Sequence, residues 1–88
     1  MEVKYLESYT ISCQDRKYIL EIIERIDIDI DRDRKEDIIE YWLQAEGYGI
    51  KQFLIGIPKE NHTEEFKIDY LENRIGIDIG NYREEFED

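Results

Sequence analysis

A single small α+β domain is the fold class that the sequence predicts, with an antiparallel β-sheet and two α-helices packed on one face. The chain has 88 residues, the length of one domain, so residues 1–88 are taken as one unit. Some segments alternate apolar and polar residues as strands do, whereas others repeat apolar residues at helical spacing. The expected element order is β-α-(β)-α-β-β-β, in which the bracketed strand is short.

The first half of the chain contains both expected helices. Residues 3–11 alternate, with β-branched and aromatic side chains on one side, which indicates a strand. Ser12 stands where a helix N-cap belongs, and isoleucines follow at helical spacing, which indicates a helix over residues 14–25. An acidic start at Asp33 precedes a second apolar stripe, which indicates a helix over residues 34–46.

Residues 26–31 alternate isoleucine and aspartate, and two structures fit this pattern. The favoured interpretation is a short edge strand between the helices, with its isoleucines toward the core. The other is an extended connector whose isoleucines close the end of the core.

The second half of the chain has strand character. Residues 49–58 form one expected strand, which ends at a proline. Residues 66–70 and 74–79 both alternate, and residues 71–74 join them, which predicts a β-hairpin. The acidic tail, residues 81–88, is expected as a short helix or a frayed end.

The charge of the chain limits its partners. Acidic residues number 23 against 12 basic ones, so the formal net charge is −11. This excess repels phosphates and therefore disfavours direct binding to nucleic acid or to an anionic membrane. A basic protein or a cation is the natural complement.

The location of the protein is expected to be cytoplasmic, or the host cytoplasm if the chain is viral. The N-terminus lacks the basic and apolar regions of a signal peptide, and no apolar run approaches the roughly 20 residues that span a bilayer. Cys13 is the only cysteine, so no internal disulfide is possible, and a buried or half-buried structural role is expected for it.

A row of acidic residues is the candidate binding site. In an extended chain, alternate aspartates point to one side about 6.6 Å apart, a spacing of the same order as that of phosphates in DNA. The partner-binding residues predicted from this row, with an aromatic anchor at its end, are Asp27, Asp29, Asp31, Asp33, Asp37, Glu40 and Tyr41. The alternative is a solvated strand face that only discourages edge pairing, and Arg32, Arg34 and Lys35 can pair with these acids locally.

The predicted function is that of an inhibitor, which docks on a basic, nucleic-acid-binding surface of a partner protein and blocks it. In size and charge the chain is similar to virus-encoded DNA mimics, including anti-CRISPR and anti-restriction inhibitors, although no motif carries this similarity. An immunity protein that neutralises a nuclease toxin is the alternative within the same class. The protein is expected to be a monomer or a homodimer.

Other functional classes have less support. The sequence lacks a catalytic triad motif, a P-loop and a dinucleotide-binding motif, so we expect neither an enzyme nor a cofactor. Four acids, Asp29, Asp31, Asp33 and Glu40, match positions 1, 3, 5 and 12 of an EF-hand loop, but Arg34 stands where that loop needs glycine. No metal site is therefore predicted, and a calcium-binding module or a non-catalytic accessory subunit remains an alternative. His62 is expected as a solvated loop residue.

Overall fold

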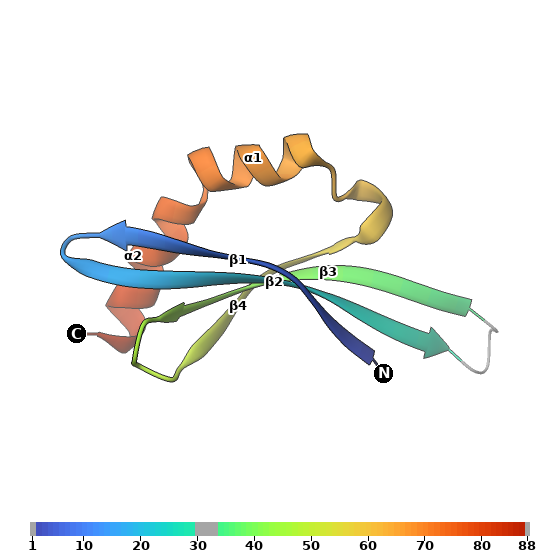
Figure 1. Cartoon of the computed structure of the whole chain (residues 1–88), viewed down its shortest axis with the longest axis horizontal. Coiled ribbons are helices and arrows are strands. Elements are labelled where there is room, and N and C mark those ends of the chain that lie inside the picture. Colours follow the sequence, from blue (N-terminus) through green and yellow to red (C-terminus); the bar gives the residue numbers. More distant parts are fainter. Residues whose placement is uncertain (1, 30–33, 88) are drawn as a thin grey trace.

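The protein is a four-stranded antiparallel sheet followed by two helices (Figure 1). The structure, a computed structural model, describes the backbone of residues 2–29 and 34–87 and the side chains of residues 2–26 and 37–87. The strands lie in the order β1-β2-β3-β4, and each is antiparallel to its neighbours. The elements are β1 (Glu2–Cys13), β2 (Arg16–Asp29), β3 (Arg34–Ala45), β4 (Lys51–Pro58), a 3-10 turn (Lys59–Asn61), α1 (Glu64–Asn73) and α2 (Ile75–Phe86).

The fold class is confirmed, but the expected element order is wrong, because both helices follow the four strands. The strands expected over residues 3–11 and 49–58 are confirmed as β1 and β4. Strand structure is confirmed for residues 26–29, but the expected short edge strand between helices is wrong, because these residues continue β2, which lies between β1 and β3. Residues 30 and 31 lie outside the described residues. The helical alternative for residues 81–88 is confirmed, since α2 extends into this tail.

Both helices expected in the first half are wrong, because residues 14–25 and 34–46 mainly form β2 and β3. In β2, buried Ile22 alternates with Ile19 and Ile23, which lie on the other face of the sheet and are half-buried. Apolar residues on both faces of a strand match a helical spacing as well as an alternating one. The β-branched side chains then favour the strand.

The hairpin expected over residues 66–79 is also wrong, because α1 and α2 occupy this segment. Thr63 caps α1, since its Oγ1 accepts a hydrogen bond from the Phe66 N–H at 3.1 Å. In α2, Ile75 and Ile79 lie four residues apart and are both buried. Alternation and helical spacing coincide here, and the cap and the sheet beneath the helices favour the helix.

The turns and the edges of the sheet have particular backbone features. Gln14 and Asp15 both have positive φ, 51° and 65°, as a two-residue turn between β1 and β2 requires. Both edge strands carry a bulge, because Leu6 in β1 and Leu54 in β4 have no partner in the register of the neighbouring strand.

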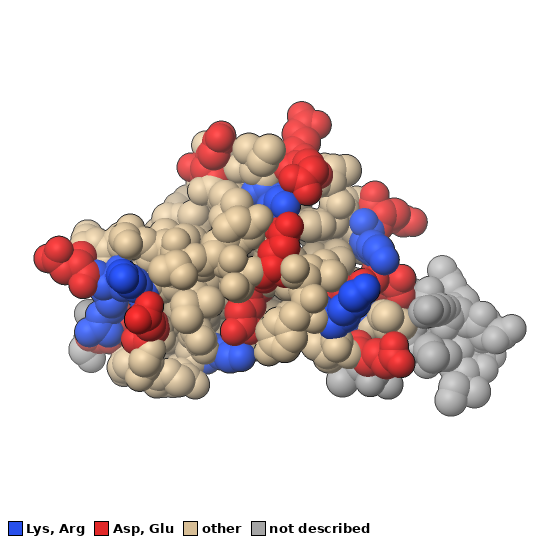
Figure 2. Space-filling model, in the orientation of Figure 1, with Lys and Arg blue, Asp and Glu red and all other residues tan. Residues whose placement is uncertain are grey.

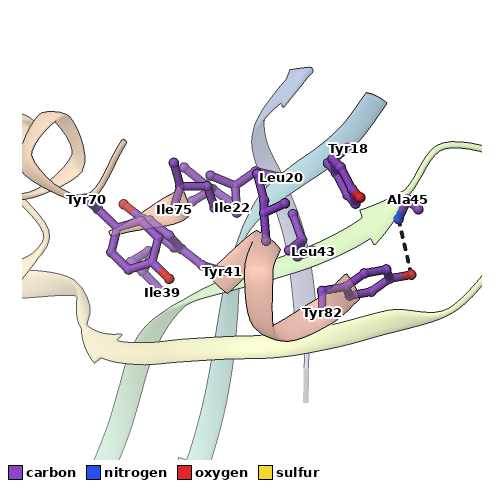
Figure 3. Packing of buried hydrophobic residues seen from close by; sticks show 11 residues of the cluster. Tyr18, Leu20, Ile22, Ile39, Tyr41, Leu43, Ala45, Tyr70, Ile75 and Tyr82 are labelled. Carbon is purple, nitrogen blue, oxygen red and sulfur yellow. Dashed lines mark hydrogen bonds between the residues drawn. The ribbon is translucent and has the colours of Figure 1, made fainter. Parts of the chain in front are cut away.

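The core lies between the two helices and one face of the sheet (Figure 3). Its buried members alternate along the central strands β2 and β3, recur at helical spacing in α2 and include one residue of α1: Tyr18, Leu20, Ile22, Ile39, Tyr41, Leu43, Ala45, Tyr70, Ile75, Ile79 and Tyr82. Tyr82 anchors α2, because its hydroxyl donates to the Ile50 carbonyl at 2.7 Å and accepts from the Ala45 N–H at 3.2 Å. Its ring meets the Tyr18 ring edge to face, with centroids 6.0 Å apart.

Replacing a central core residue should cost much of the stability of so small a domain. Leu43 is fully buried, so Leu43→Ala should lower the free energy of unfolding by about 3 kcal/mol, measured by urea denaturation. As a control, Ile77 in α2 is 66% exposed, and Ile77→Ala should change stability by less than about 0.5 kcal/mol. Equal losses in the two variants would contradict the assigned core.

Candidate functional site

The β2–β3 hairpin extends beyond the rest of the sheet (Figure 1). Pairing with β1 ends at Ile26 and pairing with β4 ends at Ile38, so between these limits β2 and β3 pair only with each other. The register continues through the pairs Asp27–Glu36 and Asp29–Arg34. We call residues 27–37 the acidic arm, of which the structure describes the paired backbone segments 27–29 and 34–37.

The acidic arm has a surplus of acids. It contains six acidic residues and three basic ones, which are Asp27, Asp29, Asp31, Asp33, Glu36 and Asp37 against Arg32, Arg34 and Lys35. At least three acids therefore have no base within the arm, however the charges pair. Asp27 and Asp29 occupy alternate positions of β2, as the sequence predicted, whereas Asp31 and Asp33 lie outside the described residues.

The base of the arm is a half-buried charged cluster. Asp37 is half-buried, and no described group hydrogen-bonds its Oδ1 atom. Glu24 is buried nearby, and Lys59 lies 2.9 Å from its carboxylate. The hydrogen bond from Lys59, which outweighs the cost of burial, lowers the pKa of Glu24, so this carboxylate stays charged.

Two of the predicted site residues are not available on the surface. The expectation that Tyr41 is a surface anchor is wrong, because Tyr41 is fully buried in the core. In a strand, Tyr41 shares a face with Ile39 and Leu43, whereas the expected helix placed it away from the apolar stripe. Glu40 is 7% exposed and is already paired, since its Oε2 lies 3.2 Å from Arg25 Nε.

The acidic surplus is divided between the arm and the helical layer. Exposed acids on α1 and α2 are Glu64, Glu65, Asp69, Glu72, Glu84 and Glu85. Figure 2 shows acidic side chains over α1 and toward both ends of the molecule, with uncharged atoms over much of the surface between them. The acids of the described chain therefore do not gather on one flank.

A polar network around one buried lysine ties α1 to the sheet, and the sequence did not predict it. Lys67 is 7% exposed, and its Nζ lies 3.0 Å from the carboxylates of both Glu7 and Glu64. These two hydrogen bonds raise the pKa of Lys67, so the ammonium stays charged. Tyr9 donates a hydrogen bond to the same Glu7 at 2.8 Å. The hydrogen bonds between Lys67 and Glu7 join residues 60 positions apart, so no local sequence pattern predicts the network.

The expectation that His62 is a solvated loop residue is wrong. His62 is half-buried against Tyr41 and Phe66, and its Nε2 lies 2.7 Å from the Tyr41 hydroxyl. Burial lowers the pKa of His62 and raises the pKa of Tyr41 to about 12. At neutral pH the tyrosine is therefore protonated, and a hydrogen bond joins its hydroxyl to the imidazole. This pair stabilises the packing of the segment that leads into α1.

Nothing in the described part of the chain supports a metal centre. No group of three or more His, Cys, Asp or Glu residues among the described residues is placed to hold a metal ion. The match to the EF-hand positions also lacks the structure that an EF-hand needs, because Asp29 and Glu40 belong to paired strands and not to a helix–loop–helix unit. Cys13 is half-buried, as expected. No helix among the described residues has the length and apolar character needed to cross a membrane.

The buried histidine should make stability depend on pH. Because the pKa of His62 is lower in the folded state than its usual 6.5, the unfolded chain takes up the proton first as the pH falls. Wild-type unfolding free energy should therefore decrease between about pH 7.5 and about pH 5.5, since His62 is the only histidine. Urea denaturation across this window tests it, and His62→Gln should flatten the profile. An equally steep profile in the variant would show that another group is responsible.

Comparisons with protein-family models, curated proteins and solved structures give no match to this chain. The grounds for inferring its function are therefore its own fold, its charge and the surfaces that the fold presents.

Proposed function

We propose that the protein is a non-catalytic inhibitor whose acidic arm docks on a basic, nucleic-acid-binding surface of a partner protein and blocks it. The observation that supports the proposal best is the paired extension of β2 and β3 beyond β1 and β4, in a segment that carries three more acids than bases. A ribbon that lacks neighbouring strands on both sides can approach a groove that a broad sheet cannot enter.

The carboxylates of the arm would take the place of phosphates. Alternate residues along a strand lie about 6.6 Å apart, and adjacent strands lie about 4.8 Å apart, so a hairpin can present acids in two parallel rows. Arginine and lysine side chains that bind phosphates also bind carboxylates, often through two hydrogen bonds at arginine. Long-range attraction to the net charge of −11 would speed the encounter.

The sheet would hold the arm in a fixed direction. β2 and β3 continue without interruption from the arm into the core, where Leu20 and Leu43 are fully buried opposite each other. Because the same two strands form the arm and the core, the direction of the arm is set before binding. Such preorganisation lowers the entropy lost on association.

The partner itself should be recoverable. Tagged protein should capture a basic nucleic-acid-binding protein from the cytoplasm of its host at low salt, and capture should decrease as salt rises, because ions screen exposed charges. Identification of the captured protein by mass spectrometry distinguishes a viral defence inhibitor from an immunity protein against a nuclease. Capture that is insensitive to salt, or of acidic partners only, would contradict the proposed mechanism.

Neutralising the arm should slow binding more than neutralising the helical layer. The triple variant Asp27→Asn, Asp29→Asn and Asp31→Asn should reduce the association rate roughly tenfold at low salt, as measured by stopped-flow fluorescence. Its unfolding free energy should stay within about 0.5 kcal/mol of wild type or rise slightly, because like charges are removed.

The matched control removes three exposed charges from α1: Glu65→Gln, Asp69→Asn and Glu72→Gln. Its association rate should fall much less, because these charges lie on the helical layer and not on the arm. Equal slowing by both triple variants would mean that only total charge matters, and slowing by the α1 variant alone would assign binding to the helical layer.

A further inference from the structure

The sheet has a second face, which the helices do not cover and which we call the open face. Its central residues come from all four strands, since Tyr5 pairs with Ile23 and Trp42 pairs with Phe53. Tyr5 is 67% exposed, Val3 is 53% exposed and Phe53 is 48% exposed. The rings of Trp42 and Phe53 lie against each other, with centroids 5.3 Å apart.

The composition of the open face is unusual for a surface. An antiparallel sheet with one solvated face usually alternates apolar residues toward the core with polar residues toward water. Here many outward positions carry valine, isoleucine, tyrosine, tryptophan or phenylalanine beside the charged ones, and a shallow hollow of about 190 Å³ is lined by Val3, Tyr5, Glu21, Ile23, Trp42 and Lys51. A contiguous apolar patch of this kind marks an interaction surface.

The charges on the open face indicate what covers it. Two ion pairs lie there, Glu21 with Lys51 at 3.3 Å and Glu40 with Arg25 at 3.2 Å, so these four residues contribute no net charge. The surplus behind the net charge of −11 therefore lies elsewhere, including the acidic arm and the helical layer. A strongly basic partner is attracted to those acids and gains little from carboxylates that are already paired.

We propose that the open face binds a second copy of this chain, and that the two copies are related by a two-fold axis. Two molecules with this charge repel each other least when they meet through surfaces that carry few unpaired acids, and the charges of the open face include the two ion pairs Glu21–Lys51 and Arg25–Glu40. The two sheets would pack face to face about 10 Å apart, as in a β-sandwich. This association does not depend on the proposed inhibitor function.

The size of the face suits a dimer of moderate affinity. Four strands at about 4.8 Å and seven paired residues at about 3.4 Å give a flat outline of roughly 19 Å by 24 Å. Protruding side chains add accessible area to this outline. The two faces together would therefore bury close to the roughly 1,200 Å² that marks the lower end of specific interfaces. We therefore expect a dissociation constant in the micromolar range.

Sedimentation equilibrium tests the dimer directly. Wild-type protein should be dimeric at about 100 μM. Phe53→Asp and Tyr5→Glu should each raise the dimer dissociation constant at least tenfold, because each buries a charge in the contact. The matched control is Ile77→Asp, which adds the same charge at an exposed position of α2 and should leave dimerisation almost unchanged. Circular dichroism checks that every variant is folded.

Salt should affect the dimer and the binding of a basic partner in opposite directions. Rising salt should strengthen the dimer, because it screens repulsion between two acidic molecules, whereas it should weaken capture of a basic partner. A monomer at every salt concentration would overturn the inference. So would a dimer that Phe53→Asp and Tyr5→Glu leave intact, since that result would move the contact to a sheet edge or to the helices.

Discussion

The burial of one face of β2 and β3 beneath two helices is the constraint on which the rest of the structure depends. Tyr18, Leu20 and Leu43 are completely inaccessible there, and Tyr82 closes the end of the core with two hydrogen bonds from one hydroxyl. A chain of 88 residues with a net charge of −11 must overcome its own repulsion with this limited core. The ion pairs around Lys67 and Glu24 reduce that repulsion locally and fix the helical layer and the 3-10 turn on the sheet.

The sequence was sufficient to predict the fold class and the two edge strands, but not the order of the elements. Residues 18–25 and 38–45 carry apolar side chains on both faces, so a helical period fits them as well as a strand period. The apolar open face is the cause of this ambiguity, because an ordinary polar face would have left a clear alternation. In the second half the error was the reverse, since the isoleucines of α2 alternate in sequence while its buried face follows helical spacing.

The same ambiguity between helix and strand explains why the sequence predicted the candidate site only in part. The extended Ile–Asp segment belongs to a strand as far as Asp29, as its alternation predicted. Tyr41 was misplaced because its exposure depends on whether the surrounding segment is a helix or a strand. The half-buried position of His62 depends on Tyr41 and Phe66, which are distant or differently placed in the expected fold. The local sequence was enough to predict the acidic charge of the arm. Which side chains remain accessible depends on tertiary contacts, which the local sequence does not show.

The bulges in β1 and β4 limit how this sheet can grow. A regular edge strand is a template for open-ended addition of further chains, which leads to fibres, and β1 is 12 residues long. The extra Leu6 and Leu54 interrupt the regular row of backbone donors and acceptors and increase the local twist. A protein with an apolar sheet face therefore carries an irregularity at each border, so that stacking can close after two copies while lateral polymerisation is discouraged.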